Sequence, residues 1–228
     1  VWVVSGDYKS DADPTCEPFE NVKCVVFINE ATFGTPSYQW DKNADLGKEI
    51  YEWWKENKEQ DKNSVLFAYS LGKAQRVLGV LKDYDIPIYC HLAVTETNKH
   101  YRTQGIELSK THCLSEVDEK EKIKGALILA PQSFLESPQS KCIGKNYETA
   151  FASGWMAKGH YGFEEGFVMS DHADWNDLVK TVLETGAKRV YVQHRGKGAL
   201  VKHLRTLGLQ AYPDTELISV NPDQLQFF

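Results

Sequence analysis

The sequence predicts an α/β fold in which parallel strands carry helices on their faces. Short apolar runs alternate with longer amphipathic segments along most of the chain, a pattern typical of strands linked by helical crossovers. The most regular example is the strand, helix, strand order at residues 65–69, 72–84 and 86–92. With 228 residues, the chain can bury a sizeable core in one large domain or two small ones.

The apolar runs, bounded by glycine, proline or polar residues, mark the expected strands. These are residues 1–4, 22–28, 65–69, 86–92, 126–130, 166–169 and 189–193, with a last extended piece at 216–220. Helices are expected where apolar residues recur every three or four positions. These are residues 46–58, 72–84, 175–186 and 199–207, with a more polar helix at 95–104.

Composition narrows the class of protein. The chain is 42% hydrophobic and 25% charged, as in ordinary globular domains. No apolar run approaches the roughly 20 residues needed to cross a bilayer, so no membrane partner is expected. The five cysteines are scattered and form no CxxC pair. We therefore expect reduced thiols and a cytoplasmic location rather than disulfides or a cysteine zinc site.

Charge is unevenly distributed. A net charge of -6 argues against a general polyanion-binding surface. Residues 185–213, however, contain no acidic residue. The basic residues of this strip are Lys188, Arg189, Arg195, Lys197, Lys202 and Arg205. Such a strip suits a phosphate-bearing substrate held at one edge, or equally a solvated helix face, and composition does not separate the two.

Two histidines follow apolar runs. His172 lies in the loop Ser170-Asp171-His172-Ala173-Asp174-Trp175, between the run 166–169 and the next helix, and His194 ends the run 189–193. In layered α/β proteins, chemistry is usually placed at the carboxyl ends of strands. If the two runs are neighbouring strands, both imidazoles emerge at one sheet edge. The alternative is two unrelated surface histidines.

Two carboxylates occupy similar positions. Asp7 stands where the first strand stops at a glycine, and Glu30 follows the second strand, where a buried carboxylate needs a partner. Asp7 could also be a turn-forming aspartate. Histidines with carboxylates suit a divalent metal that activates water. The chain contains neither HExxH nor HxHxDH, so these residues alone indicate only a metal or phosphate site.

Gly72-Lys73 suggests a phosphate loop, but the full pattern requires glycine at 67 and Ser or Thr at 74, where the chain has Phe67 and Ala74. Ser70 to Lys73 also spells the SxxK of serine β-lactamases, without that class's companion motifs. What remains is the weaker hypothesis that Ser70 and Lys73 contact one phosphate at a helix start. An ordinary helix start is the alternative.

Several segments, in this order, resemble the metallo-β-lactamase-fold nucleases of the β-CASP group. They are Ser5-Gly6-Asp7, Glu30-Ala31-Thr32-Phe33-Gly34, Ser70-Leu71-Gly72-Lys73-Ala74-Gln75, Ala152-Ser153-Gly154-Trp155-Met156, Ser170-Asp171-His172-Ala173-Asp174 and Val192-Gln193-His194. The residues of these segments are most similar to those of the bacterial ligase-associated DNA exonuclease branch, which is often labelled an mRNA 3'-end processing factor. The resemblance implies the C-terminal part of a metallo-β-lactamase αββα sandwich at 1–40 and 149–228. Residues 41–148 would be an inserted, Rossmann-like β-CASP cap.

The resemblance also implies residue roles. Asp7 would bridge two zinc ions (Zn2+), and His194 would bind one of them. Glu30 would pair with His172, which acts as an acid on the scissile phosphate or the leaving group, and a glutamate partner raises an imidazole's proton affinity. Further roles fall to four residues: Ser70, Lys73 and Ser153 as phosphate contacts, and Asp174 as a support of the site.

This chain departs from the family in one respect. The family's HxHxDH segment and the histidine that follows it precede the strand ending at Asp7, and nothing here matches them. We therefore expect that Val1 is not the natural start. With two of the family's metal ligands present, no tight dinuclear site is expected in the chain as it stands, because ligand count sets affinity.

The expected function is that of a zinc-dependent nuclease hydrolysing phosphodiester bonds of single-stranded DNA or RNA, in DNA repair or mRNA 3'-end processing. A DNA ligase is a candidate partner. The choices between DNA and RNA and between exonuclease and endonuclease stay open. One alternative is an inactive nucleic-acid-binding or scaffolding relative. The presence of Asp7, Glu30, His172 and His194 argues against it, but the missing ligands keep it open. Another is a small-molecule hydrolase of the same fold, such as a thioesterase.

Overall fold

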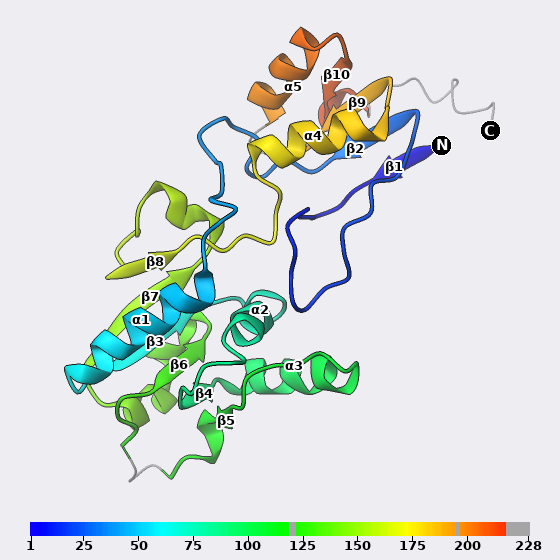
Figure 1. Cartoon of the computed structure of the whole chain (residues 1–228). Helices are drawn as coiled ribbons and strands as arrows, with labels where there is room; N and C mark the ends of the chain where they lie inside the picture. Colours follow the sequence, from blue (N-terminus) through cyan, green and yellow to red (C-terminus); the bar gives the residue numbers. More distant parts are fainter. Residues whose placement is uncertain (119–121, 195–196, 218–228) are drawn as a thin grey trace. The chain divides into compact units, whose positions relative to one another are not determined.

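The computed structural model describes residues 1–118, 122–194 and 197–217 (Figure 1). The chain folds into two compact units, each built on its own parallel sheet. Unit 1 comprises Val1–Asp11, Pro18–Asp41 and the chain from Asp171 onward, whereas unit 2 comprises Ala12–Glu17 and Lys42–Ser170. The predicted α/β class is confirmed.

Four of the described strands form the sheet of unit 1, in the order β1-β2-β9-β10. They are β1 (Trp2–Val4), β2 (Val26–Asn29), β9 (Arg189–Val192) and β10 (Gln210–Pro213). All neighbours are parallel, and the register aligns Val4 with Ile28 and Asn29 with Val192. Because parallel strands end at one edge of a sheet, the loops after β1, β2 and β9 meet at that edge.

Helices α4 (Trp175–Thr185) and α5 (Lys197–Thr206) cover one face of this sheet. Phe27 and Val190 of the sheet pack there against Leu178 and Leu204 of the helices. A smaller apolar cluster, Val26, Ile28 and Tyr191, occupies the opposite face. Helix α4 ends at Gly186, whose φ of 68° is the left-handed conformation that glycine adopts at helix ends.

The sheet of unit 2 has six described strands in the order β5-β4-β6-β3-β7-β8, all parallel. They are β3 (Asn63–Phe67), β4 (Ile88–Cys90), β5 (His112–Cys113), β6 (Leu127–Ala130), β7 (Tyr147–Ala152) and β8 (Glu165–Phe167). From β3 the chain leads through a helix to β4, on one side of the sheet (Figure 1). From β7 it leads to β8, on the other side, so the connections after these two neighbouring strands diverge.

The two faces of this sheet carry different elements. Helices α1 (Leu46–Glu59), α2 (Lys73–Val80) and α3 (Leu92–Thr103) pack on the face that presents Leu66 and Leu129. Short 3-10 helices η1 (Leu114–Glu116), η2 (Gln132–Glu136) and η3 (Pro138–Ile143) contribute to the apolar cluster on the other face, with Phe67 and Ile128. A further 3-10 helix, η4 (Gly154–Lys158), joins β7 to β8.

Several predicted element boundaries are wrong. The strand expected at 22–28 begins only at Val26, because the Cys24 and Val25 amides donate to Thr185 and Val1. Leu92, expected to end a strand, starts α3, where the His91 side chain caps the helix by accepting from the Ala93 amide.

The predicted C-terminal extended piece, 216–220, is also wrong where it can be compared. Glu216 ends the 3-10 helix η5 (Asp214–Glu216), and residues 218–220 lie outside the described residues. The strand that does form here is β10, which the apolar pattern did not predict. It is short, and Gln210 and Pro213 interrupt any apolar run within it.

The second predicted domain boundary also differs from the observed division. Residues 149–170 belong to unit 2, because β7 pairs with β3 and β8 pairs with β7. The run 166–169 therefore precedes His172 without being a neighbour of β9, since β8 and β9 lie in different sheets. The metallo-β-lactamase and β-CASP assignments stay predictions.

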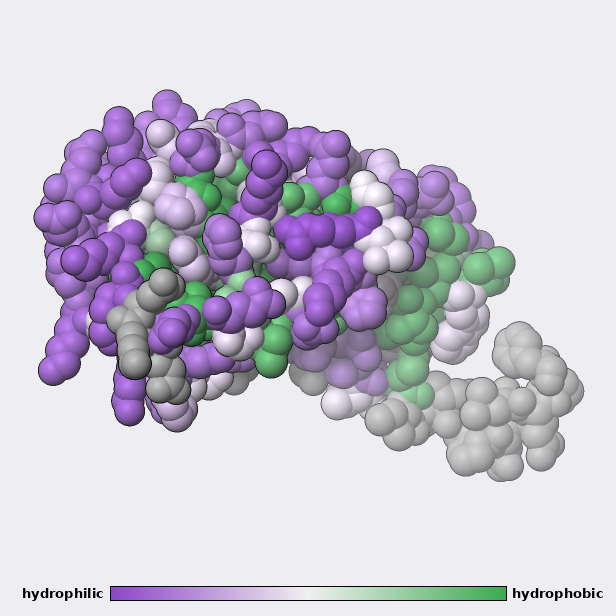
Figure 2. Space-filling view, turned by 90° about the horizontal axis from the view of Figure 1, so that it is seen from below, coloured by the Kyte–Doolittle hydropathy of each residue, from purple (hydrophilic) through white to green (hydrophobic). Residues whose placement is uncertain are grey.

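Hydrophilic side chains predominate on the face shown in Figure 2. No helix within the described parts of the chain is long and apolar enough to span a membrane. The large apolar side chains that remain exposed include Trp2 and Val4 on the edge strand β1 and Tyr69 and Leu71 in the loop after β3.

Candidate functional site

The loops after β1 and β2 are tied to each other at the carboxyl edge of the unit 1 sheet. The Ser5 amide donates to the Ile28 carbonyl at 3.1 Å, and the Glu30 amide donates to the Ser5 hydroxyl at 3.1 Å. The Tyr8 hydroxyl donates to the side-chain carbonyl of Asn29 at 2.9 Å in a buried position. These bonds fix the residues next to both predicted carboxylates, Asp7 and Glu30.

His172 and Glu30 form a hydrogen-bonded pair, with 3.0 Å between Nδ1 and Oε2. Only 2% of the Glu30 side chain is exposed, and its other oxygen, Oε1, accepts from the Thr32 amide at 2.5 Å. Burial alone raises the pKa of Glu30, but the hydrogen bonds from His172 and Thr32 outweigh burial and lower it. An ionised Glu30 accepts hydrogen bonds only, so Nδ1 of His172 carries the proton.

The same pair shifts the histidine. The hydrogen bond to Glu30 raises the pKa of His172 and outweighs partial burial, which lowers it, while the charges of Glu30, Asp7 and Asp171 add to the rise. The second ring nitrogen, Nε2, lies 3.9 Å from Oδ2 of Asp7. One donor atom each from Asp7, Glu30 and His172 lies within 4.8 Å of the other two.

His194 reaches the same cluster from β9. The register of β2 with β9 places it there, and the Gln193 amide donates to the Asn29 carbonyl at 2.9 Å. Its Nε2 lies 3.9 Å from Oε1 of Glu30, and 56% of its side chain is exposed. His194 has a φ of 64°, a conformation uncommon outside glycine and often found at functional positions. The structure thus brings Asp7, Glu30, His172 and His194 together in unit 1.

Asp174 stabilises the loop that carries His172. It is fully buried and caps α4, with Oδ1 accepting from the Asp177 amide at 2.9 Å and Oδ2 from the Trp40 amide at 2.8 Å. The Trp40 indole Nε1 donates to the His172 carbonyl at 3.3 Å, and the buried Phe33 ring meets the His172 ring edge-on. These contacts set the position of the imidazole.

The donor set fits zinc in kind and is incomplete in number. Zinc takes four nitrogen, sulfur or oxygen ligands. Glu30 already accepts hydrogen bonds from Thr32 and His172, whereas the side chains of Asp7 and His194 are 69% and 56% exposed. Asp7 and His194 therefore have the most accessible donor atoms of the cluster, whereas Asp7, Glu30 and His172 are the three whose donor atoms lie within 4.8 Å of one another. Neither set alone reaches the four ligands that zinc takes.

The predicted phosphate contacts Ser70, Lys73 and Ser153 lie in unit 2, after the neighbouring strands β3 and β7. Ser70 is half-buried. Lys73 is 4% exposed, with Nζ 4.7 Å from the centre of the Tyr69 ring. Ser153 is 2% exposed, and its hydroxyl accepts from the Trp155 amide. Their role in binding phosphate stays a prediction.

The basic strip is only partly described. Arg195 lies outside the described residues, as does the side chain of Lys197. Lys188, Arg189 and Lys202 are exposed. Arg205 donates to the Ala211 carbonyl at 2.7 Å and lies over the Tyr212 ring. Arg205 thus serves packing within unit 1.

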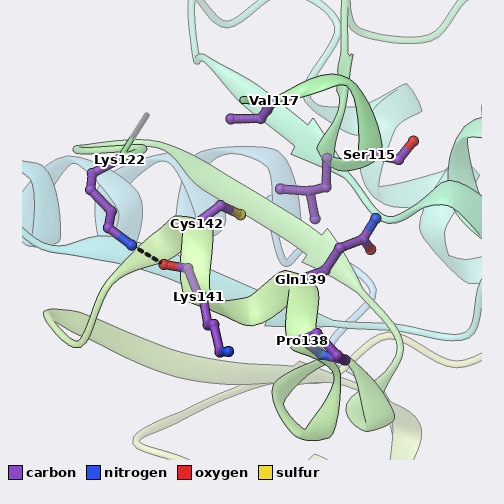
Figure 3. Close-up of a pocket in the computed structure, with 8 residues that line it drawn as sticks. Ser115, Val117, Lys122, Pro138, Gln139, Lys141 and Cys142 are labelled. Carbon is purple, nitrogen blue, oxygen red and sulfur yellow. Dashed lines mark hydrogen bonds between the residues drawn. The ribbon is translucent and has the colours of Figure 1, made fainter. Parts of the chain in front are cut away.

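A pocket of about 360 Å³ lies between η1 and η3 of unit 2 and contains none of the predicted site residues (Figure 3). The Lys122 amine at its rim donates to the Lys141 carbonyl at 2.6 Å. Burial raises the pKa of the Cys142 thiol, which disfavours the reactive thiolate. The Cys142 thiol is therefore a poor nucleophile, and the Lys122 amine is engaged with the Lys141 carbonyl.

Tyr8, Asn29, Phe33 and Trp40 were not predicted as site residues. Each is adjacent in space to a predicted residue but distant in sequence from its partner: Tyr8 and Asn29 are 21 positions apart, and Trp40 and Asp174 are 134 apart. The one available signal was that Tyr8 and Asn29 flank Asp7 and Glu30 in the chain.

Fold and site together define an α/β protein with two parallel sheets and a carboxylate–imidazole cluster at the carboxyl edge of one of them. No family model matches the chain. The chain is similar to a protein of Opitutus terrae (strain DSM 11246 / JCM 15787 / PB90-1) described as "Probable DNA ligase", with 30% identity over 212 residues. The match covers 91% of this chain and 20% of that protein, so the chain spans about a fifth of its relative's length.

Proposed function

We propose that this chain carries part of the active site of a zinc-dependent nuclease that hydrolyses phosphodiester bonds in DNA. The observation that supports this most directly is the His172–Glu30 pair at 3.0 Å, with Asp7 3.9 Å from the other nitrogen of the same imidazole. A buried carboxylate that holds an imidazole through Nδ1 leaves Nε2 to act as a proton donor.

In this proposal His172 protonates the leaving oxygen. Glu30 keeps the ring in one orientation and raises the pKa of His172, so that a larger fraction of the imidazole is protonated near neutral pH. Phe33 and the Trp40 indole restrict the ring and its backbone. Zinc, held by Asp7, His194 and further ligands, would supply an activated water. Ser70, Lys73 and Ser153 are proposed to contact substrate phosphates.

The relative supports DNA as the substrate. A protein named as a probable DNA ligase contains a region similar to 91% of this chain. A ligase joins DNA ends, and a nuclease site in the same polypeptide would act on ends of the same kind. We therefore favour a role in DNA repair, with a DNA ligase as partner, over mRNA 3'-end processing. All five cysteines are free thiols, which fits a reducing compartment such as the cytoplasm.

The test is hydrolysis of end-labelled DNA and RNA oligonucleotides of one sequence by the full-length protein with added zinc. His172→Ala should lower the rate by about 100-fold or more, the usual contribution of a general acid. Exposed His100 in α3 provides the matched control, His100→Ala, which should keep the wild-type rate. Unchanged cleavage by His172→Ala would remove this histidine from the mechanism.

Zinc binding can be followed without activity. Equilibrium dialysis should show less bound zinc for Asp7→Asn and for His194→Gln than for the wild type, while His100→Ala retains the wild-type amount. Equal zinc content in all four proteins would remove Asp7 and His194 as ligands.

A second candidate is a non-catalytic nucleic-acid-binding relative. The observation that favours it is the donor count, because Asp7 and His194, the two residues proposed as zinc ligands, are fewer than the four that zinc takes. Binding of oligonucleotides by the full-length protein without any hydrolysis in zinc would support this candidate.

A further inference from the structure

The loop between β3 and α2 projects two large apolar side chains into solvent. Tyr69 is 61% exposed and Leu71 is 71% exposed, although their neighbours Ala68 and Ala74 are buried. Leaving such side chains in water forgoes the burial that stabilises folded chains. Two of them on one short loop make that loop a candidate for contact with another molecule.

This loop is rigid rather than loose. The Gln75 side chain accepts from the Gly72 amide at 2.8 Å and donates to the Ser70 carbonyl at 3.1 Å. The same amide group donates to buried Asn98 on α3 at 2.8 Å. Gly72 has a φ of 81°, which a residue with a Cβ rarely adopts. The backbone that carries the two exposed side chains is therefore held in place by these bonds.

The place of the loop in the sheet is one where ligands bind. It follows β3, which lies next to β7, and the connections after these two parallel strands lead to opposite sides of the sheet. Such a switch point, outside the carboxyl ends of the strands, is where open α/β sheets bind ligands. Unit 2 alone contains both strands, so the site does not depend on unit 1.

The chemistry of the loop indicates the ligand. The amine of Lys73, a buried residue that is 4% exposed, lies over the Tyr69 ring at 4.7 Å from its centre, so a positive charge supports an aromatic side chain that is itself 61% exposed. Proteins that bind single strands use aromatic rings on which bases stack, together with basic residues near the backbone. Duplex DNA would keep its bases stacked on one another and out of reach of this ring.

We propose that Tyr69 and Leu71 form a platform on which a nucleobase of single-stranded nucleic acid stacks. This inference depends on the proposed nucleic-acid substrate but not on its hydrolysis. It adds contacts with bases to a site for which only phosphate contacts were predicted.

The test measures binding of two fluorescein-labelled single strands by anisotropy, oligothymidylate and an oligomer of equal length made of abasic sites. Tyr69→Ala should weaken oligothymidylate binding about 5- to 100-fold, the usual effect of removing one stacked base contact. Tyr69→Phe should retain binding, and Leu71→Ala should weaken it less. Affinity for the abasic oligomer should be the same for the wild type and Tyr69→Ala.

The matched control is Tyr161→Ala, since Tyr161 is a 62% exposed tyrosine of the same unit and should not affect binding. If Tyr69→Ala binds oligothymidylate like the wild type, or loses abasic binding equally, the platform is refuted. If the wild type binds the strand through Tyr69 but no nuclease activity exists, the platform stands and the proposed hydrolysis fails.

Discussion

The hydroxyl of Tyr8 donates to the side-chain carbonyl of Asn29 at 2.9 Å, in the interior of unit 1. Tyr8 directly follows Asp7, and Asn29 directly precedes Glu30, so this one bond links the two loops that carry the carboxylates of the candidate site. Burial raises the pKa of the Tyr8 phenol, which keeps it a hydrogen-bond donor throughout the physiological range.

Tyr8→Phe should destabilise the protein by about 1–3 kcal/mol, because the buried Asn29 carbonyl would lose its partner. The ring itself, stacked on Phe19, would remain. Urea denaturation followed by circular dichroism measures the change. Tyr161→Phe, at an exposed position, should stay within about 0.5 kcal/mol of the wild type. An equal effect of both substitutions would show that the Tyr8–Asn29 bond contributes nothing specific.

Asp174→Ala should cost about 2–3 kcal/mol, since it removes the cap of α4 and leaves the Trp40 amide without its acceptor. The control is Asp45→Ala, an exposed cap of α1 that accepts from the Lys48 amide alone. That change should cost about 1 kcal/mol. Thermal denaturation of both variants gives the comparison, and a smaller loss for Asp174→Ala would contradict the bracing role of this residue.

The His172–Glu30 pair should give the free energy of unfolding a distinct pH dependence. His172 has a pKa raised above its ordinary 6.5, so its contribution is complete below pH 6.5 and is lost as the pH rises through the folded-state value. Glu30 has a pKa lowered from 4.5, so its contribution is complete above pH 4.5 and is lost as the pH falls through the folded-state value. The pair should therefore stabilise most between these two ordinary values.

Denaturation of the wild type and His172→Gln from pH 4 to 9 measures this dependence as a difference between the two proteins. That difference should be greatest at about pH 4.5–6.5 and shrink on either side. His100→Ala serves again as the surface control. A difference that does not vary with pH would show that the pair is not linked to protonation.

Two helical glycines should respond oppositely to alanine. A Cβ on Gly47 of α1 would lie 2.5 Å from the Val80 carbonyl oxygen, which is closer than non-bonded atoms approach each other. Gly47→Ala should therefore destabilise the protein by about 1–3 kcal/mol. A Cβ on Gly198 of α5 meets nothing within 4 Å. Gly198→Ala should therefore stabilise by about 0.5 kcal/mol through helix propensity. The melting temperatures of the two variants should move in opposite directions, and a shared direction would contradict the close approach of Gly47 to the Val80 carbonyl.

The main parts of the site were predictable from the sequence because parallel strands end together. Asp7, Glu30 and His194 each follow an apolar run, and β1, β2 and β9 are consecutive neighbours in one sheet. Burial of Glu30 against a partner was also predictable, since a carboxylate at the end of a buried strand is stable only when paired. The alternation of apolar runs with amphipathic segments likewise predicted parallel sheets covered by helices.

What could not be predicted depends on pairing between distant segments. The apolar run before His172 is indistinguishable by composition from a strand of the His194 sheet, yet β8 pairs with β7 instead. The contact of Trp40 with Asp174 joins residues 134 positions apart, and no local pattern specifies it. The burial of Lys73 and Ser153 likewise depends on tertiary packing rather than on the motif that contains them.

The connection between β1 and β2 leaves unit 1 for six residues, and these residues complete unit 2. A Cβ added to Gly79 would lie 2.9 Å from the Pro14 side chain and 3.1 Å from the Thr15 side chain. Asp13 forms an ion pair with Arg76. Neither unit is thus an uninterrupted stretch of polypeptide. A single proteolytic cut where the chain passes between the units would leave them joined by the other passages. A gene fragment encoding residues 42–170 would lack Asp13, Pro14 and Thr15.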